Sequence, residues 1–302
     1  MAGATHTMPT PMLVAALAAV LTSLCGAHAA RAQDPAAVGA RAREQIYFIP
    51  VVDGPRVVQL HARICRPWGD ARARLVVINH GSPRGAANRP RMRLGHCDSE
   101  ATRWFLSRGY VVAYALRRGY GETGGSWAED YGSCSNPDYL HAGIETARDI
   151  DAVVQYATAL PFVERQGAVV VGQSAGGWGT IAYASLPHAK VSAFVVMAGG
   201  RGGHENNEPN RNCRPDRLVE AARAFGASAR TPMLWIYAQN DSYFDPGMAR
   251  ALWRAFTAAG GRADLQQPGP FEADGHHLFF GPGGSNVWGP LVERYLQDTA
   301  AQ

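Results

Sequence analysis

The chain contains almost no lysine, and its arginines lack the context of a nucleic-acid-binding module. Lys190 is the only lysine among 302 residues, so the formal net charge of +4 comes almost entirely from arginine. Four arginines lie between residues 84 and 93, which is the densest basic cluster. Since no recognition module accompanies them, we expect a solvated basic surface and no nucleic-acid partner.

The cysteines lack the spacing of a metal site. None of the four downstream of residue 33 belongs to a C-x-x-C pair or has a suitably spaced histidine nearby, which argues against structural zinc. An even number instead suits disulfides in an oxidising compartment. Three pairings are possible, and the sequence does not choose among them. The four are Cys65, Cys97, Cys134 and Cys213.

Long apolar runs are also absent, except near the N-terminus. Residues 12–28 are apolar but too short for a membrane span, and small residues follow as far as Ala32. This pattern is typical of a secretory signal peptide, although no lysine or arginine precedes the apolar run. We therefore expect a signal peptide at residues 1–32 and a periplasmic or secreted protein with no stable membrane anchor after cleavage.

Residues 33–302 show no internal repeat and no Pro/Ser-rich linker, which predicts a single domain. Short apolar runs alternate with helical patterns, and runs such as LVVIN at residues 75–79 are apolar throughout. Strands of this kind are buried on both faces of a sheet, so the pattern predicts a mostly parallel, doubly wound α/β sheet. The predicted strands lie near residues 57–64, 75–79, 110–115, 167–172, 191–197 and 232–238, and the predicted helices at residues 99–108, 140–158 and 246–259.

One strand leads into a glycine-rich turn that carries a serine. Residues 172–176 read Gly-Gln-Ser-Ala-Gly and fit the G-x-S-x-G nucleophile elbow, with an apolar strand before them and a helical pattern after them. Such a turn lifts the Ser174 hydroxyl above the carboxyl ends of the strands, where ligands bind in α/β sheets. The backbone N–H of Ala175 is expected to face the same space.

A serine at neutral pH needs a base to take its proton and an acid to orient that base. Asp241 follows a predicted strand and is the favoured acid, with Asp245 as the alternative. The base is expected on a loop between the last strand and the last helix, where two histidines are adjacent. We favour His276, because Gly275 before it allows close backbone approach, and His277 remains the alternative.

A second glycine motif matches a dinucleotide-binding pattern, but no helical pattern follows it. Residues 119–124, GYGETG, match the dinucleotide-binding pattern G-x-G-x-x-G. That pattern needs a helix to begin at the loop, because the helix N-terminus binds the pyrophosphate, and here a polar, turn-rich segment follows. We therefore expect a conformationally demanding loop and no nucleotide cofactor.

Together these motifs resemble the α/β-hydrolase superfamily and, within it, the dienelactone-hydrolase and prolyl-oligopeptidase-related branch of small serine hydrolases. The resemblance spans roughly residues 45–298. It implies an α/β-hydrolase fold in which the N–H groups of Ser82 and Ala175 form an oxyanion hole. Dienelactone hydrolases use a cysteine nucleophile, so lactone chemistry is not implied here. The matching blocks are VINHGS (77–82), RGYGETGG (118–125), GQSAGG (172–177), YAQNDSYF (237–244) and DGHHLF (274–279).

The segment between the sixth and seventh strands of this fold is short. It covers residues 197–231, so we expect only a small insertion there and a small lid. Arg201 follows a strand end and is a candidate to bind a substrate carboxylate. Tyr120 and Trp178 are further candidates for substrate contact.

We therefore predict an exported serine hydrolase that cleaves a small carboxylic ester through an acyl-enzyme, with no metal and no other cofactor. Ser174 is the expected nucleophile, His276 the general base and acid, and Asp241 its orienting group. A peptidase or amidase remains an alternative, because the same triad and the same branch serve both. A non-catalytic binding protein of this fold is a third hypothesis, although all three triad members are present. The sequence does not indicate the oligomeric state.

Overall fold

The computed structural model describes residues 1–3 and 43–300 of the chain. The fold described below belongs to one of two units of the chain, which covers residues 34–302. Apart from residues 1–3, the predicted signal peptide at residues 1–32 lies outside the described residues, so its presence and its cleavage stay predictions.

Eight strands of the described chain form one sheet. They are β1 (Glu44–Asp53), β2 (Arg56–Cys65), β3 (Leu75–Asn79), β4 (Val111–Ala115), β5 (Ala168–Gln173), β6 (Val191–Met197), β7 (Met233–Ile236) and β8 (Ala263–Gln266). Their order in the sheet is β1-β2-β4-β3-β5-β6-β7-β8. β2 pairs antiparallel with β1 and with β4, whereas all other neighbours are parallel. The predicted mostly parallel sheet is therefore confirmed.

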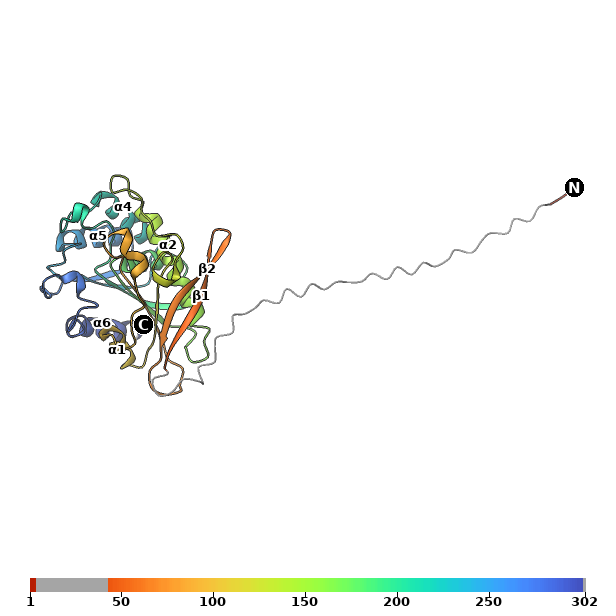
Figure 1. The fold of residues 1–302 in the computed structure, drawn as a ribbon, viewed down its shortest axis with the longest axis horizontal. Coiled ribbons are helices and arrows are strands. Elements are labelled where there is room, and N and C mark those ends of the chain that lie inside the picture. The colour runs from red at the N-terminus through yellow and green to blue at the C-terminus, as the bar shows by residue number, and fades with distance from the viewer. Residues whose placement is uncertain (4–42, 301–302) are drawn as a thin grey trace. The chain divides into compact units, whose positions relative to one another are not determined.

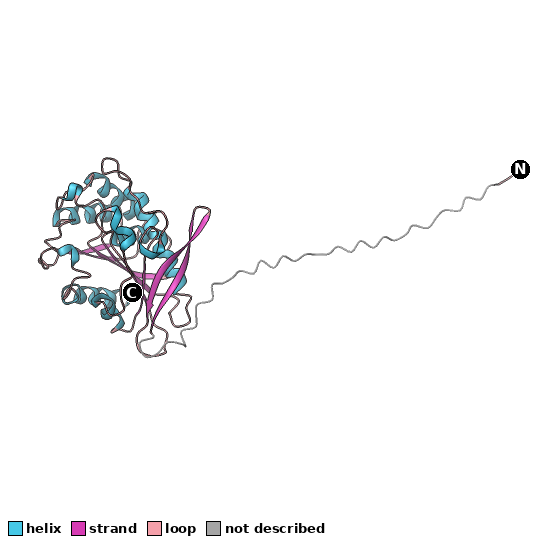
Figure 2. Ribbon diagram, in the orientation of Figure 1, coloured by secondary structure: helices cyan, strands magenta, loops and turns pink. Residues whose placement is uncertain are grey.

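Six α-helices of the described residues cover both faces of this sheet. They are α1 (Glu100–Leu106), α2 (Tyr139–Ala157), α3 (Ala175–Ala184), α4 (Pro215–Gly226), α5 (Pro246–Ala258) and α6 (Ser285–Ala300). α1 and α6 lie together on one side of the strands, with α2, α4 and α5 on the other (Figures 1 and 2). Because helices cover both faces, β3 is buried along its whole length, as its apolar sequence requires.

The structure also contains elements that the sequence pattern does not predict. β1 lies at the edge of the sheet, alternates buried with exposed residues and contains Pro50, a residue that edge strands tolerate. β8, at the other edge, has four residues, none of which is fully buried. The predicted insertion at residues 197–231 contains α4, which packs against α5.

Two disulfides join segments that are distant in the sequence. Cys65 pairs with Cys97, and Cys134 pairs with Cys213. The first ties the end of β2 to the segment before α1, and the second ties the loop that follows β4 to the segment before α4. Among the described residues, no helix has the length and apolar character needed to cross a bilayer.

Both disulfides should stabilise the fold by restricting the unfolded chain. The two disulfides join residues that are 32 and 79 positions apart in the sequence. Loss of conformational entropy of the unfolded chain in loops of such lengths stabilises the folded state by about 4 kcal/mol per disulfide. We expect replacement of either pair by serine to lower the free energy of unfolding in urea by about 2–4 kcal/mol. Unchanged unfolding midpoints in both double variants would contradict this prediction.

Candidate active site

Ser174 lies between β5 and α3 in a backbone conformation that side chains rarely adopt. Its φ is 55° and its ψ is −118°, and strain of this kind costs on the order of 1–3 kcal/mol. The Ser174 N–H donates to the carbonyl of Met197 at 3.0 Å, and its own carbonyl accepts the N–H of Gly200 at 3.1 Å. A Cβ at Gly176 would lie 2.5 Å from the carbonyl oxygen of Asn79, so the turn packs closely only with glycine there. The sharp strand-to-helix turn expected at Ser174 is present.

His276 and Asp241, the predicted base and acid, are in direct contact. Nδ1 of His276 lies 3.0 and 3.1 Å from the two carboxylate oxygens of Asp241, and both side chains are buried. The Nδ1–H therefore donates to the carboxylate, which leaves the Nε2 lone pair free to accept a proton. Asp241 Oδ1 also accepts the backbone N–H groups of Tyr243 and Phe244 at 2.8 and 3.0 Å. These bonds fix the carboxylate against the imidazole.

The histidine loop also approaches the serine turn. Gln173, directly before Ser174, donates from Nε2 to the carbonyl of His276 at 3.1 Å. A Cβ at Gly275 would lie 2.6 Å from Oδ1 of Asn240, which explains the glycine before His276. The loops that carry the three predicted triad residues follow β5, β7 and β8, and the histidine loop contacts the serine turn through Gln173.

Asp245 and His277, the alternative acid and base, lie in different surroundings from Asp241 and His276. Asp245 caps the N-terminus of α5, where its Oδ1 accepts the N–H of Met248 at 2.7 Å. His277 is exposed, whereas the neighbouring His276 is buried against Asp241. Of the two histidines, His276 is the one whose ring bonds a carboxylate, that of Asp241.

Asp274 joins the acid loop to the histidine loop, a role that the sequence analysis missed. Its Oδ1 accepts the backbone N–H groups of Ser242 and His276, each at 3.0 Å, and its Oδ2 accepts the Ser242 hydroxyl at 2.6 Å. Burial raises the pKa of Asp274, but these hydrogen bonds outweigh it and lower the pKa below its ordinary value. The signal in the sequence is an aspartate two residues before a histidine, a spacing at which the side chain bonds the backbone.

The loop after β3 brings Ser82 to the same place as Ala175 and Ser174. All three residues line one cavity. The oxyanion hole expected from the backbone N–H groups of Ser82 and Ala175 stays a prediction. His80 holds this loop: its Nδ1–H donates to the carbonyl of Gly81 at 2.7 Å, and its Nε2 accepts the N–H of Arg117 at 3.3 Å. Burial, together with the Arg117 charge, lowers the pKa of His80 to about 3, so the ring stays neutral.

Tyr120 and Trp178, predicted as candidates for substrate contact, lie in the interior instead, where both are fully buried. The Tyr120 hydroxyl contacts the carboxylate of Glu129 and lies 2.9 Å from Oγ of Ser82, so it supports the Ser82 loop. The Trp178 indole N–H donates to the carbonyl of Tyr139 at 2.8 Å. Buried tyrosine and tryptophan usually find such partners, which explains why aromatic type alone misplaces them.

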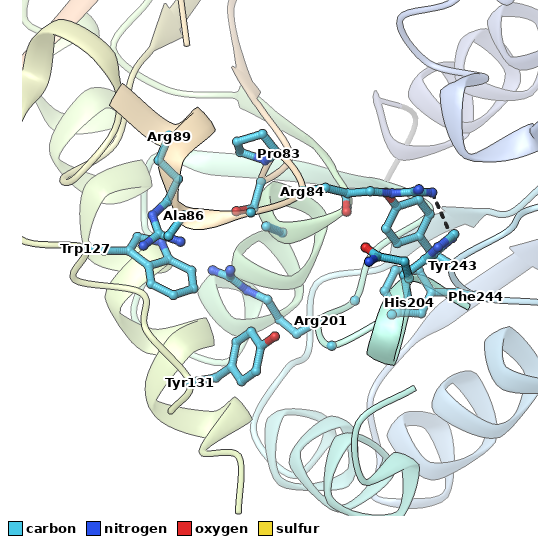
Figure 3. Close-up of a pocket in the computed structure, with 18 of the residues that line it drawn as sticks. Pro83, Arg84, Ala86, Arg89, Trp127, Tyr131, Arg201, His204, Tyr243 and Phe244 are labelled. Carbon is cyan, nitrogen blue, oxygen red and sulfur yellow. Dashed lines mark hydrogen bonds between the residues drawn. The ribbon is translucent and has the colours of Figure 1, made fainter. Parts of the chain in front are cut away.

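The cavity beside Ser174 has a volume of about 310 Å³. Tyr243 forms part of its wall and stacks on the ring of His276, with centroids 4.0 Å apart. His204 packs on Tyr243 with the same centroid separation of 4.0 Å. Figure 3 shows His204, Tyr243 and Arg84 on one side of the cavity and Arg201 with Trp127 on the other. Arg201, a predicted substrate contact, is therefore a lining residue.

Part of the chain matches a known family. Residues 96–208 match the model of the prolyl oligopeptidase family, a segment that includes Ser174 but neither Asp241 nor His276. No curated protein sequence matches the chain.

Solved structures resemble most of the chain. The Pyrococcus furiosus esterase Pf2001 is 15% identical, with a TM-score of 0.57 over 84% of this chain and 92% of the esterase. Est1E from Butyrivibrio proteoclasticus, solved with ferulic acid bound, is 16% identical, with a TM-score of 0.56 over 84% of this chain and 100% of Est1E. The chain has the α/β-hydrolase fold.

The same fold occurs in a longer peptidase. Pyrococcus horikoshii acylaminoacyl peptidase is 15% identical to this chain, with a TM-score of 0.59 over 84% of this chain. The chain spans only 41% of that peptidase. The resemblance to the dienelactone-hydrolase and prolyl-oligopeptidase-related α/β-hydrolases that the motifs indicate is thus confirmed at the level of the fold.

Removing the Asp274 carboxylate should loosen the alignment of Asp241 with His276. We expect Asp274→Ala to lower kcat for an activated ester about tenfold or more, because small misplacements of reacting groups are costly. Asp274→Asn should restore part of the loss, since its amide oxygen can still accept the two backbone N–H groups. The measurement is kcat and KM by steady-state kinetics.

Asp245→Ala is the matched control for this experiment. It too removes a carboxylate that accepts a backbone N–H, at the start of α5, and should cost about 1 kcal/mol of stability. An equal loss of kcat in Asp245→Ala and Asp274→Ala would show that general destabilisation, and not alignment of the pair, explains the effect.

Proposed function

We propose that this α/β-hydrolase is a serine hydrolase that cleaves a small carboxylic ester through an acyl-enzyme intermediate. The observation that carries the proposal is the strained Ser174 turn, which lies beside a buried His276–Asp241 pair and opens on the same cavity as Ser82 and Ala175. Strain of this kind concentrates at functional sites, where surrounding packing maintains it. The match to a family of serine hydrolases over residues 96–208 supports the same chemistry.

In the proposed reaction the Ser174 oxygen attacks the ester carbonyl carbon while Nε2 of His276 takes the hydroxyl proton. The carbonyl electron pair moves onto oxygen, and the amides of Ser82 and Ala175 stabilise that charge, each donor contributing about 3 kcal/mol. The intermediate then collapses, the C–O bond to the alcohol breaks, and His276 returns the proton to the leaving oxygen. Asp241 stabilises the imidazolium that forms between these steps.

Water completes the cycle by the same route. It attacks the acyl carbon of the ester formed on Ser174, and His276 accepts the proton of the water and then passes it to the Ser174 oxygen. A carboxylic acid and free enzyme result. Every charge that develops in either half-reaction is balanced by the same imidazole, carboxylate and amides, so no metal is needed in this proposal.

A peptidase is the second candidate, since the matching family is that of prolyl oligopeptidase and one structural neighbour is an acylaminoacyl peptidase. The cavity of about 310 Å³ favours a small ester over a peptide as substrate, because it is at the small end of the range for small-molecule sites.

Export is part of the proposal as well. The two disulfides are typical of an oxidising compartment, and the apolar segment at residues 12–28 fits a secretory signal.

Reaction with a fluorophosphonate probe tests the nucleophile. The wild-type protein should be labelled at Ser174, because the probe needs an activated serine next to a base. Ser174→Ala should lose the label while retaining the circular dichroism spectrum of the wild type. Absence of labelling in folded wild-type protein would refute the enzymatic proposal.

Hydrolysis rates of an ester and of amide substrates distinguish an esterase from a peptidase. We expect 4-nitrophenyl acetate to be hydrolysed with a kcat/KM at least about a hundredfold above that of aminoacyl 4-nitroanilides, a difference of about 2.7 kcal/mol in transition-state stabilisation. Release of 4-nitrophenol or 4-nitroaniline is followed by absorbance, with Ser174→Ala as the background. The opposite ranking would assign the protein to the peptidases.

A further inference from the structure

The cavity beside Ser174 is lined by three arginines and by no aspartate or glutamate in the described chain. Arg84 and Arg89 belong to the basic cluster at residues 84–93, which the sequence analysis treats as a solvated surface. The third, Arg201, comes from the loop after β6. Positive charge from two distant parts of the sequence therefore meets at the site of the proposed nucleophile.

Arg201 is almost fully buried, and its guanidinium is only partly satisfied. The side chain is 2% exposed. Its Nη2 lies 2.9 Å from Oε1 of Glu129 and donates to Oγ1 of Thr146 at 3.2 Å. In the part of the chain that the structure describes, Nε has no hydrogen-bond partner. Buried polar groups are usually paired, so a missing partner at a cavity wall points to a ligand group.

Glu129 does not neutralise Arg201, because it also pairs with Arg117. The Arg117 guanidinium donates to both oxygens of Glu129, at 2.7 and 3.1 Å, so two buried cations share one carboxylate. Burial raises the pKa of Glu129, but the two guanidiniums outweigh it and hold the pKa well below its ordinary value. Arg117 is also stabilised by the nearby charge of Asp149, whereas the contacts of Arg201 with Glu129 and Thr146 leave its Nε unused among the described residues.

Trp127 connects Arg201 with Arg89 across this wall. The Arg89 guanidinium lies 3.8 Å from the centroid of the Trp127 ring, and that of Arg201 lies 6.0 Å from it. Figure 3 shows these three side chains and Tyr131 on the same side of the cavity. The indole holds the two cations near one another, which concentrates positive potential in a confined space.

We propose that this wall binds a carboxylate carried by the ester substrate, with Arg201 and Arg89 as the residues that recognise it. This inference rests on the proposed function, because it concerns the substrate of the same site. Arg201 follows Gly200, whose N–H donates to the carbonyl of Ser174 at 3.1 Å, so the anion subsite is directly linked to the serine turn. The ester and the anionic group then occupy one cavity of about 310 Å³, which limits the substrate to a small molecule.

Two pairs of esters test the proposal, because the carboxylate can belong to the acyl or to the alcohol part. The first pair is mono-4-nitrophenyl adipate and its neutral methyl ester. The second is 4-acetoxybenzoate and its neutral methyl ester. We expect the wild type to show a kcat/KM about tenfold to a hundredfold higher for the anionic member of at least one pair, as for a charge-assisted hydrogen bond.

The variants are chosen so that the ratio within each pair, and not the absolute rate, is the readout. Arg201→Gln should abolish the preference for the anionic ester, and Arg89→Gln should reduce it. Arg91→Gln is the matched control, since it removes the same charge two residues away on an exposed side chain that does not line the cavity. If Arg201→Gln fails to fold, Arg89→Gln against Arg91→Gln gives the same comparison.

The outcomes separate this inference from the proposed function. Hydrolysis of neutral esters and fluorophosphonate labelling, without preference for either anionic ester, would overturn the carboxylate subsite and leave the hydrolase intact. A preference that survives both Arg201→Gln and Arg89→Gln would also overturn it. A folded wild type with no labelling and no hydrolysis of any ester would instead refute the hydrolase itself.

Discussion

The strained backbone of Ser174 is the constraint on which the site depends. A φ of 55° is unfavourable for serine, so the turn persists only because its N–H and carbonyl are bonded to Met197 and Gly200 and because Gly176 lets the chain approach Asn79 closely. Those same contacts bring the loops after β3, β5 and β6 together at the carboxyl ends of these strands. The two candidate oxyanion donors and Arg201 lie on these segments, which line the cavity together with the loops after β4 and β7. The strain and the cavity are thus consequences of the same close packing.

Much of the fold and part of the site could be predicted from the sequence because their signals are local. Strands buried on both faces are apolar throughout, as at residues 75–79, and the elbow is a run of five residues that ends in Gly176. Asp241 follows from its position in the loop after a predicted strand, whereas His276 is favoured over His277 by the glycine before it. β1 and β8 escape detection because edge strands are only half-buried or very short.

What the sequence could not show is which side chains meet across long separations. Glu129 contacts Arg201, 72 positions downstream, and Asp274 bonds Ser242, 32 positions upstream. Neither pairing leaves a periodic pattern in the sequence. Arg84 and Arg89 look like members of a solvated cluster until the fold places them at the cavity. Tyr120 and Trp178 are candidates for substrate contact by residue type, but in the fold their polar atoms bond partners in the interior.

Two of the loops that line the cavity are also tied together covalently, which bears on the size of the substrate. Trp127 and Tyr131 come from the loop after β4, Arg201 and His204 from the loop after β6, and the Cys134–Cys213 disulfide joins these same two loops. This covalent link restricts how far the two loops can separate, and therefore how far the cavity can widen for a bulky ligand. The insertion that supplies one wall carries α4, which packs on α5 and leaves no long segment to build a cap. Selectivity in such a site has to come from groups fixed in its walls, and the groups present there are guanidiniums.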